Sequence, residues 1–265
     1  MKILIKGSAG FIGYHLCKSL LDDKNEIFGV DNINDYYDPQ LKLDRNKKLN
    51  SYKSFKFKKI DISNNESLSS VFKKFKPQKV VNLAAQAGVK YSINNPYAYI
   101  QSNIVGFMNI IELCRQNKTE GLIYASSSSV YGENKKIPFS EEDCVQKPIS
   151  LYAASKLSNE LIAYSYSHLY GLNTTGLRYF TVYGPWGRPD MSYHIFTKKI
   201  VNEESINIFN HGEIKRDFTF INDIISGTKS AIKKNYNNEV FNLGNSITIN
   251  IIELIKIIEN QLGKK

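Results

Sequence analysis

Tyr152 and Lys156 are the residues whose types and spacing point most directly to chemistry. They stand four positions apart in the segment from Ser150 to Lys156, so on a helix they share one face. Tyr-x-x-x-Lys alone occurs by chance in many helices. Here it follows a glycine-rich turn near the start of the chain and a run of four serines at 126–129. In that order, the pair predicts hydride transfer.

The glycine-rich turn predicts a dinucleotide site. Gly7, Gly10 and Gly13 lie between an expected strand at 2–6 and an expected helix at 11–22. Glycine lets the backbone turn tightly and approach a pyrophosphate at a helix N-terminus, although such a turn can also be merely structural. Asp31 ends the second strand, 18 residues after Gly13, where a carboxylate would accept hydrogen bonds from a ribose diol. It would also repel a 2′-phosphate, so the predicted cofactor is NAD rather than NADP.

Short apolar runs alternate with helical patterns over the first two thirds of the chain. Alternation of this kind predicts an α/β fold with a doubly wound parallel sheet of the Rossmann type. We expect an NAD-binding domain at 1–180 and a smaller substrate-binding lobe at 181–265, between which the chain can cross back. The expected strands lie at 3–5, 27–30, 55–57, 80–83 and 122–124, then at 206–209, 218–220 and 240–243, and the expected helices at 11–22, 64–75, 97–117, 151–170 and from 251 onward.

Composition and charge limit the other classes of function. No run reaches the roughly 18 apolar residues of a membrane helix, and a strand that begins at Lys2 leaves no room for a signal peptide. Cys17, Cys114 and Cys144 are far apart without metal-ligand spacing, so we expect free thiols, no metal and a cytoplasmic location. The net charge of +10 comes from scattered lysines. A nucleic-acid binder is therefore the weaker alternative, and it would lose affinity steeply with salt.

Four segments carry a resemblance to a known family. They are Gly7 to His15, the Asp31-Asn-Ile-Asn-Asp-Tyr-Tyr-Asp38 segment, Ala84 to Ser92, and Gly184 to Met191. With them, nearly the whole chain resembles the extended short-chain dehydrogenase/reductases of the nucleotide-sugar epimerase group, and within it the UDP-glucuronate 4-epimerases. The resemblance implies NAD-dependent 4-epimerisation of a UDP-sugar, with UDP-glucuronate to UDP-galacturonate as the expected reaction, through a 4-keto intermediate. UDP-glucose 4-epimerase, another nucleotide-sugar epimerase or dehydratase, and a catalytically idle NAD-binding sensor or scaffold are the alternatives.

The resemblance also implies roles for individual residues. Tyr152 would take the proton of the sugar 4-hydroxyl, Ser127 would hydrogen-bond the same oxygen, and Lys156 completes the catalytic set. The implied cofactor-binding residues are Gly7, Gly10, Phe11, Ile12, Gly13, Asp31, Asn32, Asp61, Ile62, Leu83, Ala84, Ala85, Asn103, Ser126, Tyr152, Lys156 and Phe180. The implied substrate-binding residues are Gln86, Lys90, Ser127, Ser128, Thr181, Arg188 and Arg216, with Arg216 on the diphosphate.

A tyrosine base requires a large change in pKa. A free tyrosine has a pKa near 10. Lowering this pKa by about 3 units, so that the phenol acts as a base near pH 7, requires about 4 kcal/mol of stabilisation of the phenolate. One positive charge about 4 Å away supplies about that energy at an effective dielectric constant of 20. We expect Lys156 and the nicotinamide ring to lower the pKa of Tyr152, which then need not be deeply buried.

The substrate preference depends on a few positions. Oxidation of a glucuronate at C4 makes a β-keto acid that tends to lose CO₂, so hydroxyls and a cation must fix the carboxylate. Ser128, Thr181 and Arg188 are the candidates. Related 4,6-dehydratases carry an Asp-Glu pair where this chain has Ser128 and Ser129, so the proton carriers for elimination are missing.

The resemblance also marks two departures from the family and two further expectations. Asn82 replaces a common histidine, and Lys90 stands where arginine is frequent. The family continues past Lys265, so the small lobe should be incomplete and UDP-sugar binding weaker. Homodimers in this group pair their two long helices, and Ile100, Ile104, Phe107, Ile111 and Leu161 offer an apolar stripe for such a four-helix bundle.

Overall fold

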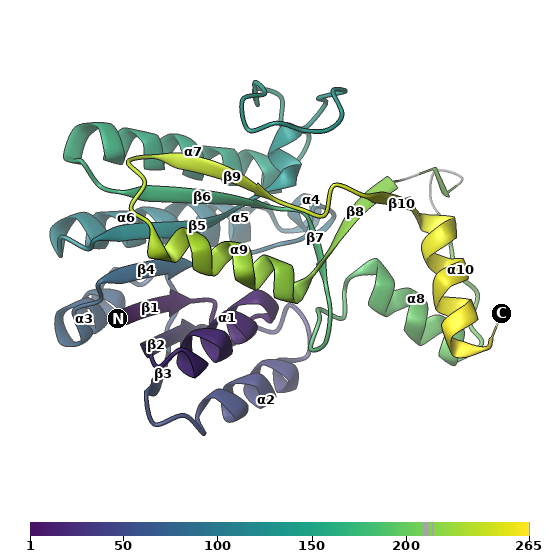
Figure 1. Cartoon of the computed structure of the whole chain (residues 1–265), viewed down its shortest axis with the longest axis horizontal. Helices are drawn as coiled ribbons and strands as arrows, with labels where there is room; N and C mark the ends of the chain where they lie inside the picture. Colours follow the sequence, from purple (N-terminus) through teal and green to yellow (C-terminus); the bar gives the residue numbers. More distant parts are fainter. Residues whose placement is uncertain (209–211, 214, 265) are drawn as a thin grey trace.

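A seven-stranded parallel sheet forms the centre of the protein. The computed structural model describes residues 1–208, 212–213 and 215–264. The strand order is β3-β2-β1-β4-β5-β6-β9, with every pair parallel, as Figure 1 shows. The strands are β1 (Lys2–Lys6), β2 (Glu26–Asp31), β3 (Phe55–Lys59), β4 (Lys79–Asn82), β5 (Gly121–Ser127), β6 (Thr174–Tyr179) and β9 (Glu239–Leu243). The predicted Rossmann-type α/β fold is confirmed.

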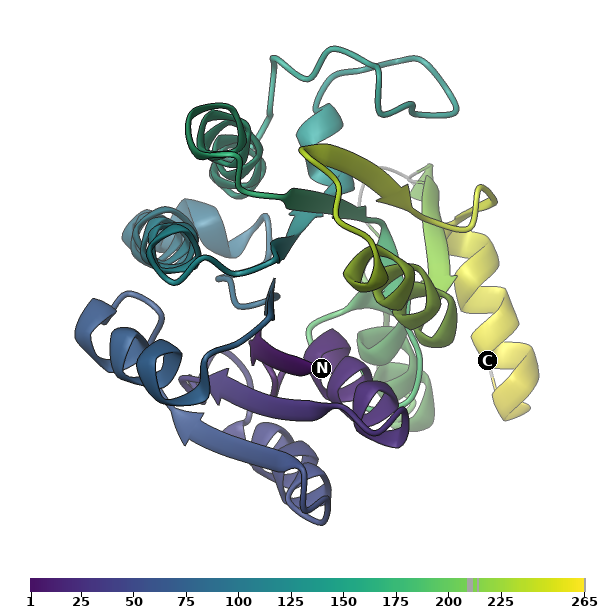
Figure 2. The same cartoon turned by 60° about the vertical axis from the view of Figure 1, so that its left-hand side comes forward.

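Helices cover both faces of the sheet, and each face has its own apolar core. On one face, α1 (Phe11–Asp22), α2 (Pro39–Leu49) and α9 (Ile221–Lys233) pack around Ile3, Ile5 and Val81. On the other, α3 (Asn65–Phe75), α6 (Gly106–Gln116) and α7 (Leu151–Tyr170) pack around Leu4 and Val80. Figure 2 shows the two layers on either side of the strands. Strands buried on both faces explain the continuous apolar runs of the sequence.

The expected helix at 97–117 is three segments in the structure. A short α4 (Tyr91–Asn94) precedes α5 (Pro96–Tyr99), a π-helix (Ile100–Val105) and α6. A Cβ on Gly106 would lie 2.5 Å from the side chain of Ile62, so glycine allows the close approach of this helix to the β3–α3 connection. A helical pattern predicts the whole span but not the change in backbone hydrogen bonding within it.

The small lobe holds a three-stranded sheet and two helices. Its strands are β7 (Thr181–Tyr183), β8 (Lys215–Phe220) and β10 (Thr248–Asn250), in the order β10-β8-β7. The helices α8 (Ser192–Val201) and α10 (Ile251–Leu262) lie together beside this sheet (Figure 1). The prediction differs at two places. Residues 206–208 form no strand and Phe209 lies outside the described residues, whereas the strand at 240–243 is β9 of the large sheet.

The apolar stripe expected for a dimer interface is divided between the core and the surface. Phe107 and Ile111 lie on α6 and are completely buried in the core of the large domain. The expectation that these two residues form part of a dimer interface is therefore wrong. Ile100 is 43% exposed and Leu161 is 62% exposed, next to the exposed Tyr164. In the described part of the chain, no helix has the length and apolar character needed to cross a bilayer.

Candidate active site

One large cavity lies at the carboxyl ends of the parallel strands. Its volume is about 1010 Å³. The strand order reverses between β1 and β4, and such a switch point is where α/β sheets bind their ligands. All but two of the residues expected to contact cofactor or substrate line this cavity. They are Gly7, Gly10, Phe11, Ile12, Gly13, Asp31, Asn32, Ile62, Leu83, Ala84, Ala85, Gln86, Lys90, Ser126, Ser127, Ser128, Tyr152, Lys156, Phe180, Thr181, Arg188 and Arg216.

The glycine turn has the geometry of a dinucleotide cradle. Gly7 adopts φ +79°, and a Cβ there would lie 2.7 Å from the backbone nitrogen of Ala84. A Cβ on Gly13 would lie 1.9 Å from the carbonyl oxygen of Gly7. Helix α1 begins after Gly10 with no side-chain cap, which leaves its first N–H groups for an anion in the cavity. These residues therefore fit the pyrophosphate of NAD.

Asp31 lies at the end of β2 with its carboxylate held by the backbone. It accepts hydrogen bonds from the N–H groups of Ala9 at 3.2 Å and Ile33 at 2.9 Å. Burial raises the pKa of Asp31, and these two hydrogen bonds and the nearby Lys42 oppose that rise. A carboxylate has about four acceptor sites, so two hydrogen bonds leave capacity for a ribose diol.

Asp61 and Asn103, both expected at the cofactor, do not line the cavity. The Asp61 carboxylate accepts from the Asn32 amide at 2.9 Å and from the Ser63 hydroxyl at 2.7 Å. The Asn103 side chain accepts from the backbone N–H of Gln86 at 2.8 Å and donates to its carbonyl at 3.0 Å. Asp61 thus holds Asn32, and Asn103 holds Gln86, two residues of the cavity wall. A direct contact of either side chain with the cofactor stays a prediction.

The start of α7 brings the three catalytic candidates together. Ser150 caps this helix by accepting from the backbone N–H of Ala153 at 3.1 Å. Lys156, one helical turn after Tyr152, is buried, and its Nζ donates to the carbonyl oxygen of Ala125 at 2.8 Å. The same Nζ lies 6.0 Å from the centroid of the Tyr152 ring. Burial lowers the pKa of Lys156 to about 8.

The electrostatics of Tyr152 differ from the expectation. Burial raises its pKa above the usual value, whereas a hydrogen bond with Ser127 and the charge of Arg188 lower it. In the protein alone, burial outweighs both effects, so the expected net lowering of the Tyr152 pKa is not present. The joint contribution of Lys156, whose Nζ lies 6.0 Å from the ring centroid, and of the nicotinamide ring stays a prediction.

The sugar side of the cavity contains hydroxyls and one buried cation. Ser128 and Thr181 are half-buried in the wall. The Arg188 guanidinium donates from Nε and Nη2 to the two oxygens of Asp190, at 3.0 and 2.5 Å. Lys90 and Arg216 are exposed at the rim. The pairing of Arg188 with Asp190 has no signal in the sequence beyond their spacing of two residues.

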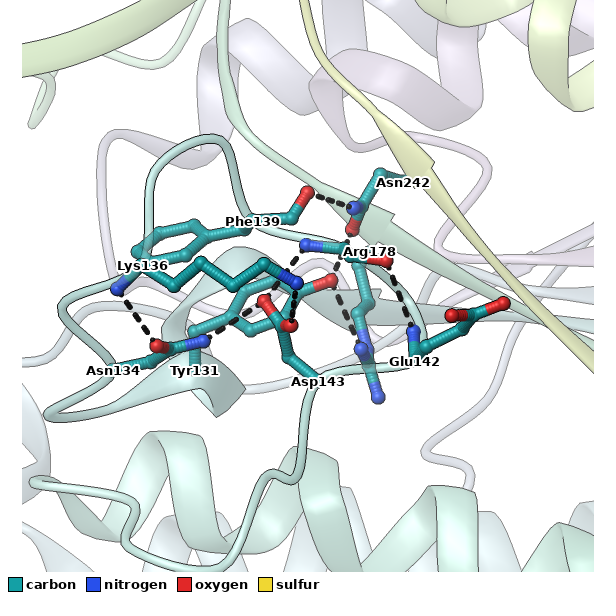
Figure 3. Close-up of polar contacts among 9 residues, drawn as sticks. Tyr131, Asn134, Lys136, Phe139, Glu142, Asp143, Arg178 and Asn242 are labelled. Carbon is teal, nitrogen blue, oxygen red and sulfur yellow. Dashed lines mark hydrogen bonds and ion pairs between the residues drawn. The ribbon is translucent and has the colours of Figure 1, made fainter.

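A buried ion pair holds the loop that forms another wall. Glu160 accepts from Arg178 at 2.8 Å, with both side chains almost fully buried, and it also accepts from the Ser126 hydroxyl. Arg178 donates to the Tyr131 hydroxyl at 3.0 Å, and Tyr131 stacks on Phe139 at 4.4 Å between centroids. Figure 3 shows this loop, with Asn242 of β9 donating to the Phe139 carbonyl at 3.2 Å.

Arg45 on α2 is another buried guanidinium, and the sequence analysis missed it. It is completely buried and donates to the carbonyl of Ala9 in the glycine turn at 3.0 Å. It also donates to the Tyr37 hydroxyl at 2.9 Å and to the carbonyl of Trp186 at 2.5 Å. One side chain thus joins the cofactor turn to the loop that carries Arg188. An arginine on a lysine-rich helix offers no signal that it is buried.

Comparison with known proteins identifies the family. The model of the NAD dependent epimerase/dehydratase family matches residues 3–244. The chain belongs to this family. The predictions of a nucleotide-sugar epimerase-group enzyme and of NAD as its cofactor are thereby confirmed. Among the described residues, no group of three or more His, Cys, Asp or Glu side chains could hold a metal ion.

Several relatives match the chain over nearly its whole length. Protein CapI of Staphylococcus aureus is 52% identical, and the match covers 100% of this chain and 84% of the relative. UDP-glucuronate 4-epimerase 4 of Arabidopsis thaliana is 46% identical over 99% of this chain and 64% of the relative. The crystal structure of UDP-glucuronic acid 4-epimerase from Bacillus cereus, in complex with UDP-glucuronic acid and NAD, is 36% identical with a TM-score of 0.93, covering 100% of this chain and 84% of that one.

Proposed function

We propose that the protein is a UDP-glucuronate 4-epimerase, which interconverts UDP-glucuronate and UDP-galacturonate. The observation that carries this proposal is the meeting of Ser127, Tyr152, Lys156 and Arg188 in the cavity that also holds the glycine turn. The names of the Arabidopsis and Bacillus relatives support the same substrate. In this proposal, residues from β7 onward supply much of the sugar side.

Bound NAD supplies the acceptor, and later the donor, of the hydride at C4. Tyr152 takes the proton of the 4-hydroxyl as the hydride leaves and returns it after the 4-keto sugar has turned over. Ser127 lines the same cavity as Tyr152 and would hold the same sugar oxygen. Lys156, fixed on the carbonyl of Ala125 at 2.8 Å, keeps its ammonium beneath the site. Since burial raises the Tyr152 pKa, the proton transfer depends on cations in the assembled complex.

The acidic sugar is favoured by hydroxyls and a guanidinium on the sugar side of the cavity. Ser128, Thr181 and Arg188 all line this cavity. Hydroxyls and a guanidinium can hold a carboxylate in a fixed direction, which keeps the β-keto acid from losing CO₂. Ser128 and Ser129 stand where related dehydratases carry an acid and a base. This chain therefore lacks the proton carriers that elimination requires at this position.

UDP-glucose 4-epimerisation is the second candidate. The ion pair between Arg188 and Asp190 neutralises the one buried cation on the sugar side, which favours a neutral hexose. The UDP-glucose 4-epimerase of Thermotoga maritima, solved with UDP-glucose, is 31% identical with a TM-score of 0.90 and covers 99% of this chain and 83% of that one.

Incubation with NAD and either UDP-glucuronate or UDP-glucose decides between the candidates. We expect UDP-galacturonate to form by anion-exchange chromatography or proton NMR, with kcat/KM for the acid at least tenfold above that for UDP-glucose. Tyr152→Phe should abolish turnover and keep NAD binding, because only the proton carrier is lost. Turnover of this variant within tenfold of the parent would contradict the role of Tyr152. Bound NAD without turnover of either sugar would indicate the idle sensor or scaffold.

We also propose that the enzyme is a cytoplasmic homodimer. Ile100 on the π-helix and Leu161 and Tyr164 on α7 are exposed apolar or aromatic side chains, and a second subunit would cover them. The cysteines are free thiols, two of them buried, as expected in a reducing compartment.

A further inference from the structure

We propose that Asp190 and Tyr36 are positioning residues that aim Arg188 at the substrate and thereby set the preference for a sugar with a carboxylate. This inference rests on the proposed function and deepens it. Neither residue was singled out by its sequence pattern.

The ion pair between Arg188 and Asp190 has a defined direction. Arg188 donates from Nε to Oδ1 at 3.0 Å and from Nη2 to Oδ2 at 2.5 Å, so the two planar groups meet edge to edge. A guanidinium has five N–H donors. The pair uses two of them, and three remain for other acceptors. Asp190 therefore fixes the plane of Arg188 without using all of its hydrogen-bonding capacity.

Tyr36 fixes the other side of Asp190. Its hydroxyl donates to Oδ2 at 3.2 Å, and its ring packs edge-on against Tyr91 at 5.0 Å between centroids. A Cβ on Gly88, at φ +103°, would lie 2.5 Å from the Tyr36 hydroxyl. The segments at 31–38, 86–91 and 184–191 thus meet around Tyr36, and its hydroxyl holds Asp190.

The pair faces the reacting end of the cavity. Tyr36, Arg188 and Asp190 all line it, together with Tyr152 and Ser127. Arg188 is near enough to Tyr152 for its charge to lower the pKa of that phenol. The side chains of Arg188 and Asp190 are only 24% and 28% exposed. A guanidinium at this place can reach a substituent of the sugar whose C4 lies at Tyr152.

Positioning matters because the pair carries no net charge. Attraction of an anion by Arg188 is opposed by Asp190, so selectivity for a carboxylate depends on donors that are already aimed at it. An arginine without Asp190 would have to be ordered when the substrate binds, which lowers affinity. The affinity for neutral sugars would not fall in this way, because they present no carboxylate to the guanidinium of Arg188.

The test compares Asp190→Asn with Tyr36→Phe and with the parent. Asp22→Asn is the matched control, because Asp22 forms an exposed ion pair with Lys18 on α1. Calorimetry with NAD-loaded enzyme measures the affinities for UDP-glucuronate and UDP-glucose, and kinetics measure kcat/KM for both. We expect Asp190→Asn to weaken UDP-glucuronate at least tenfold, with UDP-glucose and NAD changed less than threefold. Tyr36→Phe, which removes one hydroxyl, should weaken UDP-glucuronate two- to fivefold.

Equal losses on both sugars would overturn the inference and make Asp190 a scaffold of the loop. Tighter binding of UDP-glucuronate by Asp190→Asn would also overturn it, by showing that Asp190 competes with the substrate carboxylate. Failure of the proposed function appears elsewhere, as a parent enzyme that does not epimerise UDP-glucuronate. Calorimetry measures binding without turnover, so it tests the inference even if the parent enzyme is inactive. A parent that binds UDP-glucuronate no more tightly than UDP-glucose would overturn the inference.

Discussion

Lys6 on β1 should destabilise the protein at neutral pH, and Lys6→Met should relieve this. The side chain is completely buried, and its Nζ has no hydrogen-bond partner within the part of the chain that the structure describes. It lies 4.7 Å from the centroid of the Phe72 ring. Burial lowers the pKa of Lys6 to about 8.

The size of the effect follows from this pKa. A fall from 10.5 to about 8 corresponds to about 3 kcal/mol, at 1.36 kcal/mol per pKa unit. The cation–π contact with Phe72 returns up to about 2 kcal/mol of this. Methionine fills a similar volume without a charge, so Lys6→Met should raise the free energy of unfolding by about 1 to 3 kcal/mol at pH 7. At roughly 2 to 4 °C per kcal/mol, the melting temperature should rise by about 2 to 12 °C.

The pH dependence gives the prediction its sign. The folded pKa lies below the unfolded one, so between pH 8 and about 10.4 the unfolded chain binds more protons at this site. The contribution of Lys6 to parent stability therefore rises with pH in that window, and the advantage of Lys6→Met should shrink there.

Thermal unfolding of both proteins at pH 7, 8.5 and 10 measures the difference. Lys56→Met, at an exposed position of β3, is the control and should change stability by less than about 0.5 kcal/mol. A Lys6→Met variant that is no more stable than the parent at pH 7, or whose advantage is the same at every pH, would refute the reasoning.

Three further predictions concern two buried contacts around the site and the exposed face of α7. Glu160→Gln leaves the Arg178 guanidinium buried without its counter-charge, and chemical denaturation should show a loss of about 3 to 5 kcal/mol; a loss below about 1 kcal/mol would contradict this. Arg45→Lys removes the fork that joins Ala9 to Trp186, so calorimetry should show NAD and UDP-sugar each about tenfold weaker, and unchanged NAD affinity would count against the coupling. Leu161→Glu places a charge on the exposed face of α7, so light scattering should show a dimeric parent and a monomeric variant; a monomeric parent would rule the dimer out.

Local patterns were enough to predict much of the fold and part of the site. The glycine turn, the capped helix at 151–170 and the buried strands each depend on neighbours within a few positions of the chain. The carboxyl ends of parallel strands must share one edge of the sheet, so strand order along the chain already brings Asp31, Ser127 and the glycines toward one cavity. The loop around Arg188 was predicted from resemblance rather than from physics.

The sequence by itself therefore determined the type of fold, the cofactor site and the Tyr-x-x-x-Lys pair, because these depend on backbone geometry and local periodicity. Only the tertiary structure decided which polar side chains face the cavity. Asp61 and Asn103 do not line the cavity, and both side chains hydrogen-bond residues of its wall that lie on other segments. The partners of Arg45 lie up to 142 residues away in the chain. The sequence pattern around Phe107 indicates that one face of the helix is apolar, but it does not say what covers that face. In the structure, Phe107 packs in the core against the sheet and not against a second subunit. Burial and pairing are properties of all the neighbours at once, and no local pattern specifies them.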